Sequence, residues 1–344
     1  MCYGAEVTEK IAGVHYLPSP LGVDLPVVDV SHDAFERPVD SARQRAYVDE
    51  FMRQSVMPEL LFGLLPRRVR AAAMGLALRG SRLAPGIQSA EGSFLGGMAT
   101  YLFKVGQLVP DALSPIDRKI IATLPARAVR WRIFDMVDLL AEAILPRLVG
   151  DASRPLWLVN IAGGPALDSL NAVAALARTA PERMRARTVK IAVFDGDSAG
   201  PDFGARALDA WRNDGPLAGL EVRFERYAYD WNDPRPLVAA LATARAENAV
   251  VVASSEGGLF EYGADHAIEA NLRALREGCT GRVAVVGSVT RNDDVAQRMI
   301  RGSTAALVPR GLATFRSLVQ RAGFDVTRSI ARPFADDVCL EAMN

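Results

Sequence analysis

The chain has 344 residues, a length that favours one large domain or two coupled domains. Half of its residues are hydrophobic and 23% are charged, which excludes a mainly disordered chain. The 40 basic residues balance the 40 acidic ones, and no basic stripe runs along the sequence. Residues 66–70 form a tight basic cluster, which we interpret as a solvated helix face. Nucleic acid is therefore not expected as a partner.

The cysteines indicate a reducing compartment. Cys2, Cys279 and Cys339 are odd in number and far apart, which favours a cytoplasmic protein without a disulfide framework or a cysteine-based zinc site. Residues 1–6 lack the basic-then-apolar layout of a signal peptide. No apolar run approaches the ~20 residues of a membrane span. No His, Cys and Asp cluster has the spacing of metal ligands, so we expect no metal.

The first 150 residues have helical periodicity, interrupted by Pro and Gly. Helices are predicted at residues 40–65, 67–78 and 128–145. The first thirty residues are predicted to form an extended arm, and no convincing strand alternation precedes Leu156. We therefore expect an N-terminal helical domain over residues 1–150.

From residue 155 onward, short apolar runs alternate with helical stretches. Strands are predicted at residues 156–161, 189–194, 220–227, 249–254, 281–287, 324–330 and 337–342. Helices are predicted at residues 166–178, 203–213 and 311–322, and a further helix has Asp233 as its N-cap and Pro234 at its first position. This alternation predicts an α/β domain over residues 151–344, with a parallel sheet covered on both faces.

The loop after the first predicted strand runs from Asn160 to Ser169 and is rich in small residues. Ala162, Gly163, Gly164 and Ala166 would let the backbone approach a ligand and would place the next helix N-terminus against it. Ligands of open parallel sheets bind at the carboxyl ends of the strands, where this loop lies. The alternative is a tight strand-to-helix turn that binds nothing.

This loop resembles the first motif of class I S-adenosylmethionine-dependent methyltransferases, in which a strand ends as D-x-G-x-G-P-G. Asn160 stands where the family has an acid, and Ala162 and Ala166 stand where it has glycines. The amide oxygen of Asn160 could accept from a ligand ammonium but brings no charge. A dinucleotide-binding GxGxxG fingerprint does not fit, because Gly163 and Gly164 are adjacent and no third glycine follows.

The next two loops extend the resemblance. After the second strand, Asp195, with Asp197 as the alternative, stands where the family has the acid that holds the ribose hydroxyls. After the third strand, Asp230 stands where the family has an Asp that accepts from the adenine amino group. Trp231 could stack on the purine face. In the alternative interpretation no ligand binds: these acids would be solvated residues of strand-end turns, and Trp231 would cover the sheet edge.

The fourth strand runs into Ser254, Ser255 and Glu256, a segment that in the family lies along the cofactor and faces the methyl acceptor. Glu256 is the candidate general base for an acceptor that must lose a proton. His266, the one histidine of the predicted sheet domain, is a second candidate, although an exposed helical histidine is the favoured interpretation.

Two other histidines and the two serines invite further interpretations. His15 and His32 lie in the N-terminal arm, where surface roles are favoured over a place in a lid. Ser254 and Ser255 invite a hydrolase hypothesis, but the leading glycine of G-x-S-x-G is missing and His266 would have to be the base.

The resemblance covers residues 155–344 and implies a Rossmann-like, seven-stranded sheet that is mostly parallel and has an antiparallel last strand. It implies S-adenosylmethionine as cofactor and methyl transfer by in-line displacement. We expect residues 1–150 to form a lid over a small-molecule acceptor of secondary metabolism, and a homodimer is left open. The lid would include residues 61–65, 101–103, Trp131 and Phe134. The alternative function is a non-catalytic protein that binds the same cofactor.

Overall fold

The computed structural model describes most of the chain. The described residues are 11–18, 24–32, 35, 37, 40–63, 81, 101, 103–105, 114–150, 153–301 and 306–343. For residues 55–63 and 214 only the backbone is described. The expected helix at 67–78, the basic cluster at 66–70 and Cys2 lie outside the described residues, as do the side chains of residues 61–65.

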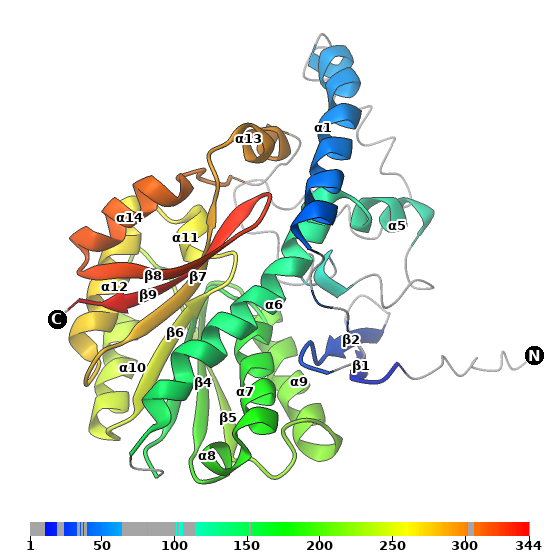
Figure 1. The fold of residues 1–344 in the computed structure, drawn as a ribbon. Coiled ribbons are helices and arrows are strands. Elements are labelled where there is room, and N and C mark those ends of the chain that lie inside the picture. The colour runs from blue at the N-terminus through cyan, green and yellow to red at the C-terminus, as the bar shows by residue number, and fades with distance from the viewer. Residues whose placement is uncertain are drawn as a thin grey trace, which may run out of the picture.

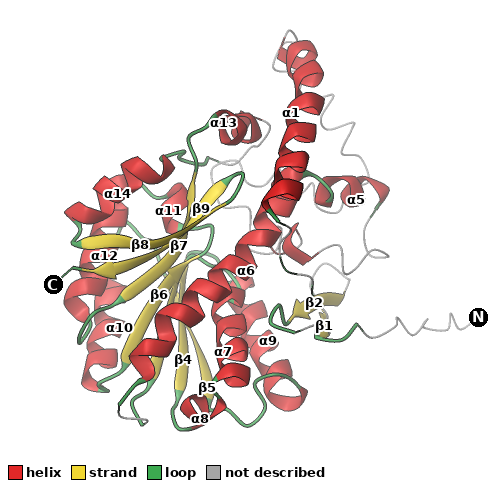
Figure 2. Ribbon diagram, viewed as in Figure 1, coloured by secondary structure: helices red, strands yellow, loops and turns green. Residues whose placement is uncertain are grey.

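A seven-stranded sheet forms the centre of the molecule (Figures 1 and 2). Its strands are β3 (Leu156–Ile161), β4 (Val189–Asp195), β5 (Val222–Ala228), β6 (Val250–Ser255), β7 (Ala284–Thr290), β8 (Phe324–Ala331) and β9 (Ala335–Ala342). They lie in the order β5-β4-β3-β6-β7-β9-β8. Adjacent strands from β5 to β7 are parallel, and β9 runs antiparallel to both β7 and β8. The predicted α/β class and mixed sheet are confirmed.

Helices cover both faces of this sheet (Figure 1). On one face lie α6 (Leu124–Ile144), α7 (Leu167–Thr179) and α9 (Ala199–Asp214), whose apolar side chains share a core with the sheet. On the other lie α10 (Arg235–Ala246), α12 (Asp265–Gly278) and α14 (Gly311–Arg321). Shorter helices are α5 (Pro115–Ile121), α8 (Pro181–Arg185), α11 (Leu259–Tyr262) and α13 (Asp294–Arg301), and η3 (Leu145–Leu148) is a 3-10 turn.

The strand β3 shows why these apolar runs form central strands. Leu156 and Leu158 enter the core on the face of α7, whereas Trp157 and Val159 enter the core on the face of α10. Because alternate side chains point to opposite faces and both faces are covered, every position of the strand is buried. A continuous apolar run is the sequence pattern that this environment requires.

The helix expected at 128–145 begins earlier, at Leu124, with Pro125 in its first turn. This helix, α6, contacts α7 and the strands β6, β7 and β9. It therefore forms a layer on the sheet. The division of the chain at residue 150 stays a prediction. The other long N-terminal helix, α1 (Ser41–Gly63), projects from the body in Figure 1.

The expected absence of strands before Leu156 was wrong. The strands β1 (Val14–Pro18) and β2 (Asp24–Val28) form an antiparallel two-stranded ribbon. Leu25 and Val27 of this ribbon are fully buried in the core shared with α7 and α9. Pro26 is compatible with β2 because, among the described residues, that strand pairs only with β1. Tertiary packing, which the local sequence does not record, stabilises the ribbon.

Two predicted boundaries also need correction. The helix α10 has Pro234 as its N-cap, not Asp233, and the Asp233 Oδ1 accepts from the Arg235 N–H at 3.2 Å. The fifth sheet strand, expected at 281–287, begins at Ala284 because Gly281 has a φ of +86° and forms the preceding turn. Among the residues that the structure describes, no helix is long and apolar enough to cross a membrane.

Candidate functional site

The candidate site lies at the carboxyl ends of β3 to β6. The chain after β3 enters α7 on one face of the sheet, whereas the chain after β6 enters α11 and α12 on the other. The boundary between β3 and β6 is therefore the topological switch point, where the connections diverge and leave a crevice. All predicted cofactor positions belong to the strand ends or loops at this edge of the sheet.

Asn160, at the end of β3, fixes the first loop through hydrogen bonds. It is fully buried, and its Nδ2 donates to the Asp168 Oδ1 at 2.8 Å and to the Ser254 Oγ at 3.1 Å. Its Oδ1 accepts from the Gly163 N–H at 3.0 Å. Asn160 therefore links the loop to α7 and to β6, and its predicted contact with a ligand ammonium stays a prediction.

The first loop keeps a glycine-like backbone although two of the expected glycines are missing. Ala162 has a φ of 55°, Gly164 of 58° and Ala166 of 51°, all in the left-handed region. Each alanine costs about 1 kcal/mol in that conformation relative to the right-handed one. Gly163 cannot be replaced in the same way, because a Cβ there would lie 2.2 Å from the Asn160 Oδ1. The turn is therefore maintained by side-chain hydrogen bonds where glycine freedom is lacking.

Asp195, the last residue of β4, supports the loop from the other side. Its Oδ2 accepts from the Gly164 N–H at 2.9 Å, and its Oδ1 accepts from the Asp197 N–H at 2.9 Å. Burial raises the pKa of the Asp195 carboxyl, and the two backbone donors oppose that rise. A carboxylate offers about four acceptor positions, so two remain for ligand hydroxyls. Asp195 is only half-buried, and Asp197 is exposed.

The third loop is exposed and locally ordered. The Asp230 Oδ1 accepts from the backbone N–H of Asn232 at 2.9 Å and from its side-chain Nδ2 at 2.8 Å. Trp231 is half-buried, and its carbonyl accepts from the Asn271 Nδ2 at 2.8 Å. These contacts fix the loop and leave Asp230 accessible to solvent. The predicted adenine contacts stay predictions.

The two serines after β6 are engaged in structural hydrogen bonds. Ser254 accepts from Asn160, and the Ser255 Oγ accepts from the Leu259 N–H at 2.8 Å, at the start of α11. Both side chains are buried, whereas His266 is exposed in the first turn of α12. The structure therefore gives no support to a serine activated by His266.

Glu256 belongs to a buried ion-pair cluster that sequence reasoning did not identify. Its Oε1 lies 2.7 Å from the Lys104 Nζ and 3.4 Å from the Arg132 Nε, and the Arg132 Nη1 lies 3.1 Å from the Glu261 Oε2. All four side chains are at most 7% exposed. The cluster joins residues 103–105 and α6 to the loop after β6. No local pattern could have found it, because the partners are far apart in sequence.

Tyr101 and residues 103–105 approach the same edge through a second contact. The ring of Tyr101 packs against the ring of Phe203 in α9, with centroids 5.0 Å apart, and Lys104 reaches Glu256. These residues therefore contact the elements that follow both β4 and β6. Trp131 and Phe134 lie in α6, where Trp131 packs with Met299 of α13. The placement of Tyr101 and residues 103–105 supports the expected lid, and the lid itself stays a prediction.

Asp168 is a further buried acid at this edge, to which the sequence patterns assigned no role. It lies in the first turn of α7 and is 0% exposed. Burial, followed by the charge of Glu256, raises the pKa of Asp168 to about 6. Its Oδ1 accepts from Asn160, but its Oδ2 has no hydrogen-bond partner within the described part of the chain.

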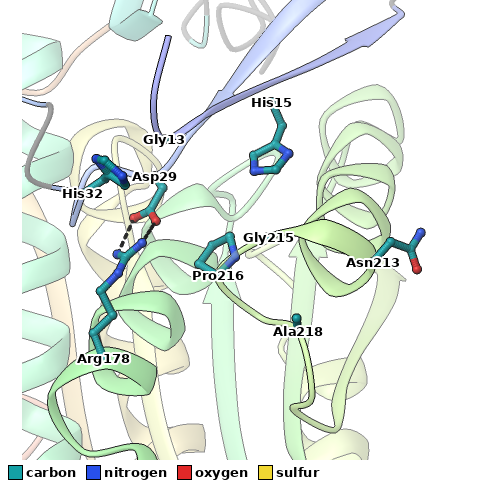
Figure 3. A pocket seen from close by; sticks show the side chains of 9 residues that line it. All are labelled: Gly13, His15, Asp29, His32, Arg178, Asn213, Gly215, Pro216 and Ala218. Carbon is teal, nitrogen blue, oxygen red and sulfur yellow. Dashed lines mark hydrogen bonds and ion pairs between the residues drawn. The ribbon is translucent and has the colours of Figure 1, made fainter. Parts of the chain in front are cut away.

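His15 and His32 lie elsewhere, in a cavity of about 410 Å³ (Figure 3). Arg178, near the end of α7, and the loop from Gly215 to Ala218, which precedes β5, also line this cavity. It therefore lies on the side of the sheet where the strands begin. Asp29 is buried there and pairs with Arg178. The structure does not bring these two histidines to the candidate site.

The side chains and backbone at the carboxyl edge fit S-adenosylmethionine. The half-exposed Asp195 retains acceptor positions suited to two ribose hydroxyls, and the exposed Asp230 can accept from an amino group. The left-handed turn at Ala162 and Gly164 exposes little side chain to an approaching ligand. No group of three or more His, Cys, Asp or Glu residues in the described part of the chain could hold a metal ion.

Comparison with known proteins shows the fold. No protein-family model and no curated protein matches the sequence. A solved structure of a possible exported protein from Bordetella parapertussis is 19% identical, has a TM-score of 0.57, and aligns over 89% of this chain and 100% of that one.

Two solved methyltransferases are also similar, at lower TM-scores. Mitomycin 7-O-methyltransferase is 14% identical, with a TM-score of 0.39, over 76% of this chain and 66% of that one. The 1,6-didemethyltoxoflavin N1-methyltransferase of Burkholderia thailandensis is 14% identical, with a TM-score of 0.37, over 61% of this chain and 79% of that one. The strand order and directions described above are those of the class I methyltransferase fold, and the chain has that fold.

Proposed function

We propose that the protein transfers a methyl group from S-adenosylmethionine to a small molecule. The observation that carries this proposal is the first loop, which Asn160 and Asp195 hold in a left-handed turn at the switch point of a class I sheet. Asp195 holds this turn while it stays half-exposed, so it keeps acceptor capacity that a ligand can use.

Different residues of the carboxyl edge would bind different parts of the cofactor. Asp195 would accept from the ribose hydroxyls while it holds Gly164, and Asp230 would accept from the adenine amino group. Trp231 would stack on the purine, and the turn at Gly163 would lie against the rest of the cofactor. The cofactor supplies a methyl group on a positively charged sulfur, so the protein mainly has to orient the acceptor for in-line displacement.

The acceptor would lie between this edge and the N-terminal region. Residues 103–105 and α6 contact the loop after β6 through Lys104 and Arg132, so they can enclose a small molecule there. We propose a secondary-metabolism acceptor and a cytoplasmic location. Glu256 or His266 would act as a base only for an acceptor that loses a proton. The ion pairs of Glu256 mean that such a role would require the cluster to open.

One observation favours a second candidate function, a protein that binds the cofactor without transferring its methyl group. Asn160 replaces the acid of the family motif and already uses its amide oxygen for the Gly163 N–H. Asn160 would therefore bind the ligand amino group more weakly than the acid of the family motif would. The two candidates differ only in turnover.

Thermal unfolding with added ligands tests the proposed function. S-adenosylmethionine and its demethylated product should raise the melting temperature, whereas NAD and NADP should leave it unchanged. A shift with the nicotinamide cofactors alone would contradict the proposal. Incubation with methyl-labelled cofactor and extracts that contain candidate acceptors then separates an enzyme from a binder, because only the enzyme transfers the label.

A further inference from the structure

Asp168 stands out among the buried acids of the molecule because it contacts the residue that departs from the family motif. Asn160, at the strand end, is uncharged, and its Nδ2 donates to the Asp168 Oδ1 at 2.8 Å. The Ser169 Oγ also donates to the Asp168 Oδ1, at 3.5 Å. The strand end itself carries no acid, but an acid at the start of α7 is hydrogen-bonded to the Asn160 side chain.

The charges around Asp168 do not balance. Its charged neighbours are Glu256, from the loop after β6, and Lys104, from the N-terminal region. Glu256 is shared between Lys104 and Arg132, and Arg132 is shared with Glu261. Lys104 and Arg132 thus face Asp168, Glu256 and Glu261, and the buried Asp337 is a further charged neighbour of Arg132, so the carboxylates outnumber the cations and Asp168 has no cation of its own. A buried charge without a partner is costly, and proteins retain such charges mainly where they serve a function.

The unpartnered oxygen is the second observation. The Asp168 Oδ2 is completely buried and has no hydrogen-bond partner within the described residues. Buried polar atoms in native proteins nearly always have partners, so an exception calls for a physical explanation. A positive charge that arrives with a ligand would compensate this carboxylate without any contact to it, because charges interact over longer distances in a dry interior than in water.

We propose that Asp168, acting through Asn160, supplies the negative charge that makes the site prefer a sulfonium ligand over the corresponding neutral thioether. This inference rests on the proposed function. Asp168 is a positioning residue here: it orients the Asn160 amide and so fixes the Gly163 N–H, while its charge stabilises a cation above the loop. The ligand chemistry it selects is a positively charged sulfur.

The preference should depend on pH because Asp168 can be neutralised. Protonation of Asp168, whose pKa is raised to about 6, would remove the unbalanced charge. The charged groups that face Asp168 are Lys104 and Glu256, which lie 2.7 Å from each other. The ratio of the two affinities should therefore fall as the pH is lowered from 7.5 to 5.

Calorimetric titration with S-adenosylmethionine and S-adenosylhomocysteine tests the inference, because the two ligands differ by the methyl group and the charge on sulfur. Asp168→Asn keeps an acceptor for the Asn160 amide and removes the charge. It should weaken binding of the methylated ligand about tenfold more than binding of the product. Asp195→Ala is the matched control, because the ribose is common to both ligands and both should weaken equally.

The outcomes separate this inference from the proposed function. If the wild-type protein binds neither ligand, the proposed function fails. If it binds both and Asp168→Asn changes both affinities equally, or neither, the role of Asp168 is overturned. The double variant Asn160→Asp/Asp168→Asn, which returns the acid to the strand end, should restore the preference. The pH series on the wild-type protein tests the same charge without any variant, and a ratio that does not change with pH contradicts the inference.

Discussion

The carboxyl edge of the sheet has two unlike halves. The half formed by the loops after β4 and β5 is open: Asp197 and Asp230 are exposed, and their carboxylates bond mainly to backbone N–H groups of their own loops. The half formed by the loops after β3 and β6 is closed: Asn160, Asp168 and Glu256 are buried and bond across the molecule. Both halves lie at the ends of adjacent strands of one sheet.

The difference indicates a division of labour. Accessible carboxylates can meet the polar groups of a ligand at little cost in protein stability, since water solvates them when the site is empty. Buried charges must be compensated inside the protein, so they can set electrostatics but tolerate little change. Variants in the closed half should therefore alter folding stability in addition to any effect on the ligand, whereas variants in the open half should alter mainly binding. The following variants test this contrast.

Glu256→Gln should have the largest effect. It leaves the buried ammonium of Lys104 without its carboxylate and weakens the contact of Arg132. Removal of one partner of a buried ion pair destabilises proteins by about 3–5 kcal/mol. Urea unfolding followed by circular dichroism measures the loss. The double variant Lys104→Met/Glu256→Leu is the control, and it should recover most of the lost stability because the ammonium is removed together with its carboxylate. Equal losses in both would show that packing matters there and not charge.

Asp168→Asn should stabilise the protein at neutral pH. The pKa of Asp168 is raised from 3.8 to about 6, so ionisation opposes folding, and that cost is present above pH 6 and absent below pH 4. Removal of the charge should gain about 3 kcal/mol at pH 7.5, and the gain should shrink toward pH 4. Unfolding curves at several pH values measure it. A loss of stability at pH 7.5 would show that the carboxylate is compensated in the free protein.

Asp195→Ala should act mainly on the ligand. It removes acceptors for two ribose hydroxyls and should weaken cofactor binding by about 2 kcal/mol, roughly thirtyfold in Kd. Asp197→Ala, two residues away and exposed, is the matched control and should change Kd little. Asp230→Ala should give a smaller loss than Asp195→Ala, confined to the adenine. Unchanged affinity in both Asp195→Ala and Asp197→Ala would show that the predicted cofactor position is wrong.

His266→Asn should have the smallest effect. The side chain is exposed in the first turn of α12, so its replacement should change the unfolding free energy by less than about 0.5 kcal/mol. Turnover of the identified acceptor then decides its role. An unchanged rate constant supports a surface histidine, whereas a large drop at unchanged cofactor affinity would assign it to proton transfer.

Local patterns were sufficient to predict the open half of the site. Asp195 and Asp230 follow strands whose apolar runs are short and continuous, so their place at the edge follows from the strand assignments alone. The small residues at Ala162 and Gly163 likewise indicated the turn. The sheet was predictable for the same reason, apart from shifts of a few residues at strand ends.

The contacts within the closed half were not predictable from local patterns. The pairing of Arg132 with Glu261 spans 129 positions, and charged residues at such separations leave no periodic signal. The N-terminal ribbon was missed because its strands have five residues each and their stability comes from burial against α7 and α9. Asn160 could be recognised as a departure from the family motif, but only the fold shows that Asp168 lies beside it.

The position of α6 has a consequence for the order in which the protein can fold. This helix precedes the sheet in sequence, yet it contacts β9, the last strand, and its Asp135 pairs with Arg332 across 197 positions. Because β9 lies between β7 and β8, the sheet cannot be completed until residues 335–342 have left the ribosome. Until then, part of the apolar face of α6 lacks its cover. Such long-range closure slows folding and leaves the unfinished chain dependent on protection from aggregation during synthesis.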